Sequence, residues 1–203
     1  MLIRDVEGQS GGFYPWVWRS EVFSREELGV ILENYSDNGL YPAGVIQADS
    51  QSDVIAIDDI RSSDINMHYM NEDNKWIFDR LDQVITWANE NFYRFDLTGY
   101  SVFQFGVYDA DKGGHYGLHM DTYIGANSLK NGQQRKLSLS ILLNDDFEGG
   151  EFVITTGGNK EEAIKLDPGM AVIFPSFIVH GVKKVTKGVR KSLVVWVQGP
   201  PFK

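Results

Sequence analysis

The chain has 203 residues, no cysteine and a formal net charge of −9. The lack of cysteine excludes disulfides, thiolate zinc sites and iron–sulfur clusters, so histidine and carboxylate side chains are the plausible metal ligands. The negative charge argues against general nucleic-acid binding, which depends on neutralising phosphates. It would suit a basic polypeptide as a partner, although acidity can also serve only to keep a protein soluble.

The size and composition suit one domain over residues 1–203, with residues 1–95 as support and residues 96–203 as the catalytic core. Hydrophobic residues make up 42% of the chain, which is too many for a disordered protein. The first residues lack the apolar run of a signal peptide, and no later stretch is apolar enough to span a bilayer. We therefore expect a cytoplasmic protein that does not bind membranes.

The first half of the chain predicts two helices. A Gly- and aromatic-rich opening over residues 11–23 indicates a short strand. Ser24 then offers a helix N-cap, and the apolar stripe after it predicts a helix over residues 25–35. Residues 41–56 indicate a loop and a strand. Over residues 71–93 apolar side chains recur at three- and four-residue steps, which predicts a longer helix buried against a sheet.

The second half predicts short strands. Segments rich in Val, Ile, Phe, Tyr and Trp are separated by Gly, Pro, Asn or Asp, and one more strand is expected from Leu118 to Asp121. The segments are 97–108, 136–143, 150–155, 170–174, 177–185 and 189–198. Such a series indicates a jelly roll or a related barrel. The predicted fold class is α+β, mainly β, with a jelly-roll core buttressed by the N-terminal helices.

Two histidines and an aspartate form a candidate metal site. His119 and Asp121 are two residues apart, so their side chains point to the same face of an extended segment. His180 follows at the end of a later apolar strand. Two imidazoles and one carboxylate, with coordination positions left open, are the ligand set of non-haem Fe(II) oxygenases. His68 and His115 have no carboxylate at ligand spacing, so we expect them to be structural.

Two acidic segments are expected to be surface loops. Residues 109–113 faintly resemble a calcium loop, but the later ligands and the closing glutamate are missing. Residues 144–150 indicate a turn between two strands. Neither segment predicts a metal site.

Three stretches of the second half carry a resemblance to a known family. They are residues 108–121 (YDADKGGHYGLHMD), residues 135–152 (RKLSLSILLNDDFEGGEF) and residues 168–196, which contain PGMAVIFPSFIVHGV and RKSLVVW. Together they cover roughly residues 97–198, and they resemble the Fe(II)- and 2-oxoglutarate-dependent oxygenases, in the prolyl 4-hydroxylase-like branch. The fold of this family is a double-stranded β-helix, which is the jelly-roll variant of the core that the strand pattern predicts.

The resemblance assigns roles to individual residues. His119, Asp121 and His180 would bind Fe(II), and Arg190 would bind the distal carboxylate of 2-oxoglutarate. Many relatives have a lysine there, whereas the planar guanidinium of arginine can hold a carboxylate with two hydrogen bonds. Lys191 is the adjacent rival, but it should point to the opposite face. The alternative for Arg190 is an exposed charge at a sheet edge.

Further residues follow from the same resemblance. Tyr108 matches a tyrosine that lines the cosubstrate pocket, and Ser192 could donate a hydrogen bond to the carboxylate held by Arg190. Tyr116 matches a tyrosine near the substrate, Trp196 matches a tryptophan of the pocket wall, and Arg61 lies where related hydroxylases place an arginine that faces the substrate. The alternative for the three aromatic residues is an ordinary place in the core.

The resemblance implies an enzyme that uses O2 to hydroxylate its substrate and converts 2-oxoglutarate to succinate and CO2, with ascorbate as an optional reductant. It favours a prolyl residue of a polypeptide as the substrate, and a small molecule is the enzymatic alternative. A cupin-type dioxygenase that binds iron without 2-oxoglutarate and a non-catalytic jelly-roll binding module are the other hypotheses.

One polar segment is a candidate lid. Residues 122–134 (TYIGANSLKNGQQ) show neither a helical nor a strand period and directly follow the first two candidate ligands. Long loops of this kind often close over an active site. We therefore expect this segment to cover the site.

Overall fold

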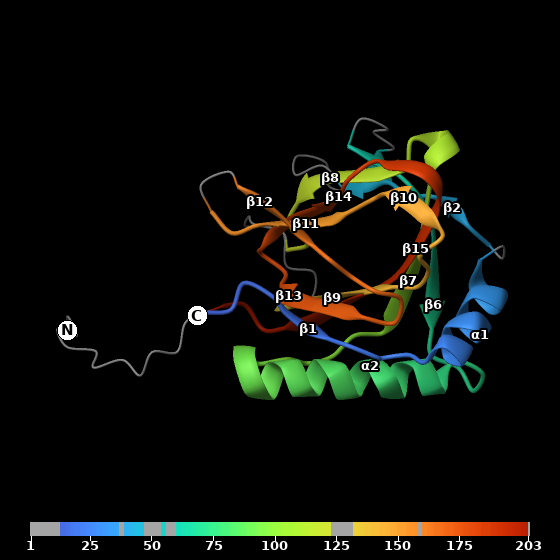
Figure 1. Ribbon diagram of the computed structural model, residues 1–203. Coiled ribbons are helices and arrows are strands. Elements are labelled where there is room, and N and C mark those ends of the chain that lie inside the picture. Colours follow the sequence, from blue (N-terminus) through green and yellow to red (C-terminus); the bar gives the residue numbers. More distant parts are fainter. Residues whose placement is uncertain are drawn as a thin grey trace, which may run out of the picture.

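In the computed structural model, the described residues are 13–36, 39–46, 54–55, 60–122, 132–157 and 160–202. Two antiparallel sheets form the body of the protein (Figure 1). The larger sheet has the order β1-β13-β9-β15-β7-β6-β2, and β10 also pairs with β15. Its strands are β1 (Val17–Arg19), β13 (Ala171–Pro175), β9 (Gln134–Leu142), β15 (Val185–Gly199), β7 (Val102–Asp109), β6 (Asp64–Tyr69), β2 (Tyr41–Pro42) and β10 (Phe147–Gly149).

The smaller sheet has the order β12-β11-β14-β8-β5. Its strands are β12 (Glu161–Ile164), β11 (Phe152–Thr155), β14 (Val179–Val182), β8 (His115–His119) and β5 (Arg61–Ser62). Two further short strands, β3 (Val45–Ile46) and β4 (Val54–Ile55), pair only with each other. The predicted fold class, a mainly β double-stranded β-helix with supporting helices, is confirmed.

Helix α1 (Arg25–Tyr35) begins and ends where the sequence predicts. The Ser24 hydroxyl accepts a hydrogen bond from the Glu27 backbone N–H at 3.2 Å, and the Glu27 carboxylate accepts one from the Ser24 N–H at 2.8 Å. This reciprocal capping box satisfies two backbone donors that the first turn would otherwise leave unpaired. A purely local interaction thus sets the start of the helix.

Helix α2 (Lys75–Ala88) and the π-helical turn η1 (Asn89–Tyr93) cover most of the longer predicted helix. The start is later than the predicted residue 71, because the side chains of Asn71 and Asn74 hold a tight turn. The Asn71 side chain accepts hydrogen bonds from the backbone of Asp73 and Asn74 at 2.9 and 3.0 Å. Asparagine competes with helix formation in this way because its short side chain can bond to the nearby backbone.

Both helices pack on the outer face of the larger sheet, and α2 runs along that face (Figure 1). Their buried apolar residues share one cluster with strand residues of the same sheet, among them Ile31, Ile77, Phe78, Leu81, Phe103, Phe105, Leu139 and Leu193. The opposite face of the sheet contributes to a second apolar cluster together with the smaller sheet. The helices therefore cover the outer face of the larger sheet, and the inner face, which is turned toward the smaller sheet, remains available for a functional site. None of the helices in the described ranges is long and apolar enough to cross a membrane.

Several strand predictions need correction. Strand β8 covers residues 115–119 rather than 118–121, and Asp121 lies in a bend whose N–H donates to the Ser176 carbonyl at 2.9 Å. The segment expected as a turn at 144–150 contains β10, which pairs with β15 far along the chain. Strand β12 has no predicted counterpart, because three of its four residues are exposed and polar or small.

Other expectations have a partial outcome. Residues 109–113 form the short 3-10 helix η2 (Ala110–Lys112) between β7 and β8. The strand expected within 11–23 is β1, at Val17–Arg19. Residues 123–131 lie outside the described part of the chain, so the expected lid stays a prediction.

Candidate active site

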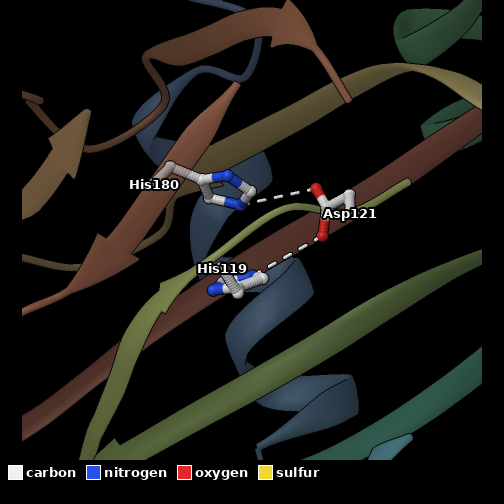
Figure 2. A group of neighbouring side chains, drawn as sticks. All are labelled: His119, Asp121 and His180. Atoms are coloured by element: carbon white, nitrogen blue, oxygen red, sulfur yellow. Dashed lines mark ion pairs between the residues drawn. The ribbon is translucent and has the colours of Figure 1, made fainter. Parts of the chain in front are cut away.

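Strands β8 and β14 are antiparallel neighbours and place His119 directly opposite His180. Their ring centroids are 4.3 Å apart. Asp121 follows on the bend after β8, with Oδ1 3.6 Å from His119 Nε2 and Oδ2 3.4 Å from His180 Nε2 (Figure 2). One donor atom from each side chain lies within 4.8 Å of the other two. The three side chains converge on one point, as the ligands of a metal ion do.

Each histidine is oriented by the strand that carries it. Nδ1 of His119 lies 2.9 Å from the carbonyl oxygen of Gly117, and Nδ1 of His180 lies 2.9 Å from that of Ile178. A carbonyl can only accept a hydrogen bond, so Nδ1 carries the proton on both rings when they are neutral. The lone pair is then on Nε2, which faces Asp121. This is the tautomer that a metal-binding histidine needs.

Burial and charge keep the cluster ready to bind a cation. Burial lowers the pKa of His180 to about 4, so this ring is neutral near pH 7, as a metal ligand must be. Burial alone would raise the pKa of Asp121, but the neighbouring His180 and His119 outweigh it and hold the pKa well below its usual range. The carboxylate is therefore ionised. Together the cluster offers one anionic oxygen ligand and two imidazole nitrogen ligands.

Arg190 lies in β15 and is only 2% exposed. Its Nη1 has no hydrogen-bond partner in the part of the chain that the structure describes. Tyr108 lies opposite on β7, with its ring centroid 5.5 Å from the guanidinium carbon. Burial lowers the pKa of Arg190, but a guanidinium stays charged in proteins. A buried cation with an unpaired donor is costly, so the geometry indicates a place for an anionic ligand.

One cavity between the two sheets joins the metal cluster to Arg190. All nine side chains selected from the sequence line it: His119, Asp121, His180, Arg190, Tyr108, Ser192, Tyr116, Arg61 and Trp196. Sequence reasoning missed the other lining residues, which are Gln104, Ser140, Phe152, Phe174, Val182 and Val194. A signal for Gln104 and Ser140 was available, since each is a polar residue at an alternate position of a strongly apolar strand.

The cavity wall formed by the larger sheet is polar. Gln104, Ser140 and Ser192 are 4%, 5% and 1% exposed, and all three line the cavity. A Cβ built on Gly106 would lie 3.5 Å from Ser192 Oγ and 3.6 Å from Gln104 Nε2. These two polar groups therefore lie beside the position that a side chain at residue 106 would occupy. Buried polar groups normally find partners, so this wall suits a ligand rich in oxygen atoms.

Tyr116 and Arg61 form a stack on the metal cluster. Tyr116 precedes His119 by three residues and would face the other side of a regular strand. A register shift in the pairing of β8 with β14 turns it to the same side, and its ring stacks on His119 at a centroid distance of 3.6 Å. The Arg61 guanidinium lies 4.4 Å from the Tyr116 ring centroid, and its Nε donates to Ser63 Oγ at 2.8 Å.

Trp196 forms another part of the cavity wall. Its indole Nε1 is buried and has no hydrogen-bond partner in the described part of the chain. The Arg135 guanidinium lies 4.1 Å from the centre of its ring. An indole N–H can only donate, so the cavity presents a donor that a carbonyl oxygen could satisfy.

The two remaining histidines lie outside this cavity. His68 packs on the helix side of the larger sheet, with ring centroids 4.4 Å from Tyr35 and 5.1 Å from Phe103. His115 begins β8, and its Nδ1 lies 2.9 Å from the Gly113 carbonyl. Neither belongs to the cluster that could hold a metal.

Gly150 supports Arg190, and we expect Gly150→Ala to disturb it. An added Cβ would lie 3.0 Å from Arg190 Cδ and 2.9 Å from Val185 Cγ2. The backbone φ of +67° adds strain of about 1–2 kcal/mol for any residue with a Cβ. Chemical denaturation should show a lower free energy of unfolding, and calorimetry should show weaker binding of a dicarboxylate.

Gly132→Ala is the matched control for this prediction. Gly132 has the same φ of +67°, but an added Cβ would meet no atom of the described residues within 4 Å. It should therefore show the backbone strain alone. Equal losses of stability and equal carboxylate affinity in the two variants would contradict a role for the contact with Arg190.

Comparison with known proteins gives one family. Residues 103–198 match the model of the 2OG-Fe(II) oxygenase superfamily. A PKHD-type hydroxylase of Picosynechococcus sp. is 44% identical over 85 residues, which are 41% of this chain and 36% of that protein. A PKHD-type hydroxylase of Psychrobacter sp. is 40% identical over 97 residues, which are 46% of this chain and 36% of that protein. The chain thus covers little more than a third of the length of these relatives.

Solved structures show the same fold. A Pseudomonas putida prolyl-4-hydroxylase aligns with a TM-score of 0.69 and 18% identity, over 92% of this chain and 94% of that one. A Trichoplax adhaerens prolyl hydroxylase, solved with a peptide fragment of hypoxia inducible factor, aligns with a TM-score of 0.71 and 17% identity, over 90% and 83% of the two chains. Residues 103–198, a little under half of the chain, thus match the 2OG-Fe(II) oxygenase superfamily, and the chain shares its fold with these prolyl hydroxylases.

Proposed function

We propose that the chain is an Fe(II)- and 2-oxoglutarate-dependent hydroxylase that acts on a prolyl residue of a polypeptide. The observation that carries this proposal is the buried, incompletely paired Arg190 in the same cavity as the His119–Asp121–His180 cluster. A cupin-type dioxygenase would need the metal ligands but not a buried cation beside them. A binding module with a lost metal site would have no reason to keep either.

The residues present fit both groups. Two imidazoles and one carboxylate suit Fe(II), and they leave other coordination positions free. Arg190 suits the distal carboxylate of 2-oxoglutarate, because a guanidinium can donate two parallel hydrogen bonds to it. Ser192 and Gln104 lie next to each other above Gly106 and add neutral polar groups to the cavity. Tyr108, opposite Arg190, closes the same end of the cavity.

When bound, Fe(II) and 2-oxoglutarate supply the oxidation, in which one atom of O2 enters the substrate as hydroxyl and 2-oxoglutarate becomes succinate and CO2. The chain's own residues would bind the metal and the cosubstrate, orient them and exclude water. His119, Asp121 and His180 would hold the metal, and Arg190 would orient the cosubstrate through its distal carboxylate. Apolar walls limit water, since Phe152, Phe174 and Val182 line the same cavity.

Three observations support a polypeptide substrate. The relatives reported above are named hydroxylases, and one of the similar structures was solved with a bound peptide. The Arg61–Tyr116 stack and the unpaired indole N–H of Trp196 line the cavity and offer groups to a peptide backbone. The net charge of −9 would favour a basic polypeptide over an acidic one.

The first test needs no knowledge of the substrate. Fe(II) and then 2-oxoglutarate are added under anaerobic conditions, and the weak visible charge-transfer band of the chelated cosubstrate is measured. We expect the band in the wild type and its loss in His119→Ala. Iron binding without a band would favour the cupin hypothesis. Failure to bind iron would favour the hypothesis of a non-catalytic jelly-roll binding module.

The substrate needs a second test. Proline-containing peptides, basic and acidic, and a set of small metabolites are incubated with the loaded enzyme, and mass spectrometry detects the gain of one oxygen atom. We expect the gain on a prolyl residue, with a preference for basic peptides. Hydroxylation of a small molecule alone would contradict the polypeptide assignment while leaving the oxygenase assignment intact.

A further inference from the structure

We propose that Ser138 is a positioning residue that fixes the Asp121 carboxylate for metal binding, through a hydrogen-bond relay that begins at Ser176. The proposal rests on the proposed function only in that the cluster binds a metal. Ser138 Oγ lies 2.7 Å from Asp121 Oδ2 and 2.9 Å from Ser176 Oγ. Both serine side chains are 0% exposed, so no solvent competes for these bonds.

The direction of the relay follows from the number of hydrogens. An ionised carboxylate can only accept hydrogen bonds, so Ser138 gives its one hydroxyl hydrogen to Asp121. Ser138 must then accept from Ser176, which donates its own hydroxyl hydrogen. The bond to the carboxylate is charge-assisted and is therefore stronger than a neutral one. The second bond polarises the first and strengthens it further.

Ser176 also holds the backbone of the same ligand. Its carbonyl accepts hydrogen bonds from the N–H groups of Asp121 and Thr122 at 2.9 and 3.0 Å. Its own N–H donates to the carbonyl of Lys136 at 3.0 Å, beside Ser138 in β9. The turn after β13 thus holds the main chain of Asp121 by direct hydrogen bonds, and it holds the side chain of Asp121 through Ser138. Asp121 needs this support because it lies beyond the end of β8.

The relay fixes the rotation of the Asp121 carboxylate. Ser138 donates to Oδ2, which also faces His180 Nε2 at 3.4 Å, and Oδ1 faces His119 Nε2 at 3.6 Å. Without the relay, the carboxylate would be free to turn about its own bonds. Ser138 therefore acts on the chemistry through Asp121 and does not itself touch substrate.

The test measures metal binding rather than turnover. Anaerobic titration with Co(II), followed by its visible absorption, gives both the affinity and the coordination of the ion. We expect Ser138→Ala to lower the affinity by about 10–100-fold, the usual cost of losing a group that orients a ligand. We expect its Co(II) spectrum to differ from the wild-type spectrum, because the carboxylate is released. Ser138→Thr keeps a hydroxyl and should restore both properties.

Thr155→Val is the control. Thr155 lies in β11, which pairs with the strand that carries His180, and its buried hydroxyl does not line the cavity. It should keep the wild-type Co(II) affinity and spectrum. Ser176→Ala removes only the outer bond of the relay and should give a smaller loss than Ser138→Ala.

The outcomes separate this proposal from the proposed function. Failure of the wild-type chain to bind Co(II) or Fe(II) would overturn the proposed function. Wild-type affinity and spectrum in folded Ser138→Ala would overturn the relay alone. If circular dichroism shows that Ser138→Ala does not fold, Ser176→Ala is the variant that tests the relay. A wild-type Co(II) spectrum and affinity in that variant would likewise overturn the relay.

Discussion

His180→Ala is expected to lose more than about 100-fold in metal affinity, since the loss of a merely orienting group already costs 10–100-fold. His180 supplies one of three ligand atoms, and its Nε2 is held toward Asp121 by the hydrogen bond from Nδ1 to Ile178. Water cannot easily replace it, because the ring is only 5% exposed. Metal titration should show the loss, and any hydroxylation should fall below detection.

His115→Ala is the control for a histidine change in the same region. His115 lies at the start of β8, four residues before His119, and it does not line the cavity. Its variant should bind metal as the wild type does. Unchanged metal affinity in His180→Ala, or an equal loss in His115→Ala, would contradict the assigned ligand set.

Arg190→Met is expected to weaken 2-oxoglutarate binding without lowering the stability of the protein that lacks cosubstrate. The two charge-assisted hydrogen bonds lost are together worth about 3–4 kcal/mol, or roughly 100–1,000-fold in affinity. The folded protein, in contrast, no longer buries a cation with an unpaired Nη1. Replacement of a buried charge by a well-packed apolar side chain is often neutral, or stabilising by about 1–4 kcal/mol.

Thermal unfolding with and without 2-oxoglutarate, in the presence of Co(II), measures both effects. The wild type should gain stability with the cosubstrate, and Arg190→Met should gain almost none. Lys191→Met is the control, because the side chain of Lys191 points away from the cavity that Arg190 lines. A strong loss of stability in Arg190→Met without cosubstrate would contradict this prediction. It would mean that the buried Arg190 stabilises the protein even when no cosubstrate is bound.

The sequence by itself determined the features that depend on short-range interactions. Helix α1 follows from the Ser24 cap and the apolar stripe after it, both of which act within a few residues. The two-residue spacing of His119 and Asp121 predicts a shared face, and both residues do line the cavity, although β8 ends at His119. The predicted fold is confirmed, and the match of residues 103–198 to the 2OG-Fe(II) oxygenase superfamily agrees with the predicted family. The roles of the individual site residues stay predictions.

Only the tertiary structure decided which distant residues meet. The register of β8 with β14 sets His180 against His119, and that of β15 with β7 sets Arg190 against Tyr108. The register shift that turns Tyr116 toward His119 has no visible sequence pattern.

The same holds for the relay from Ser176 and Ser138 to Asp121, and for strands β10 and β12. Strand pairing depends on the competition of many long-range partners, and a register slip of one residue moves every side chain to the other face. Local sequence carries the strand pattern and the ligand spacing, whereas the contacts across strands are specified only when the whole core packs.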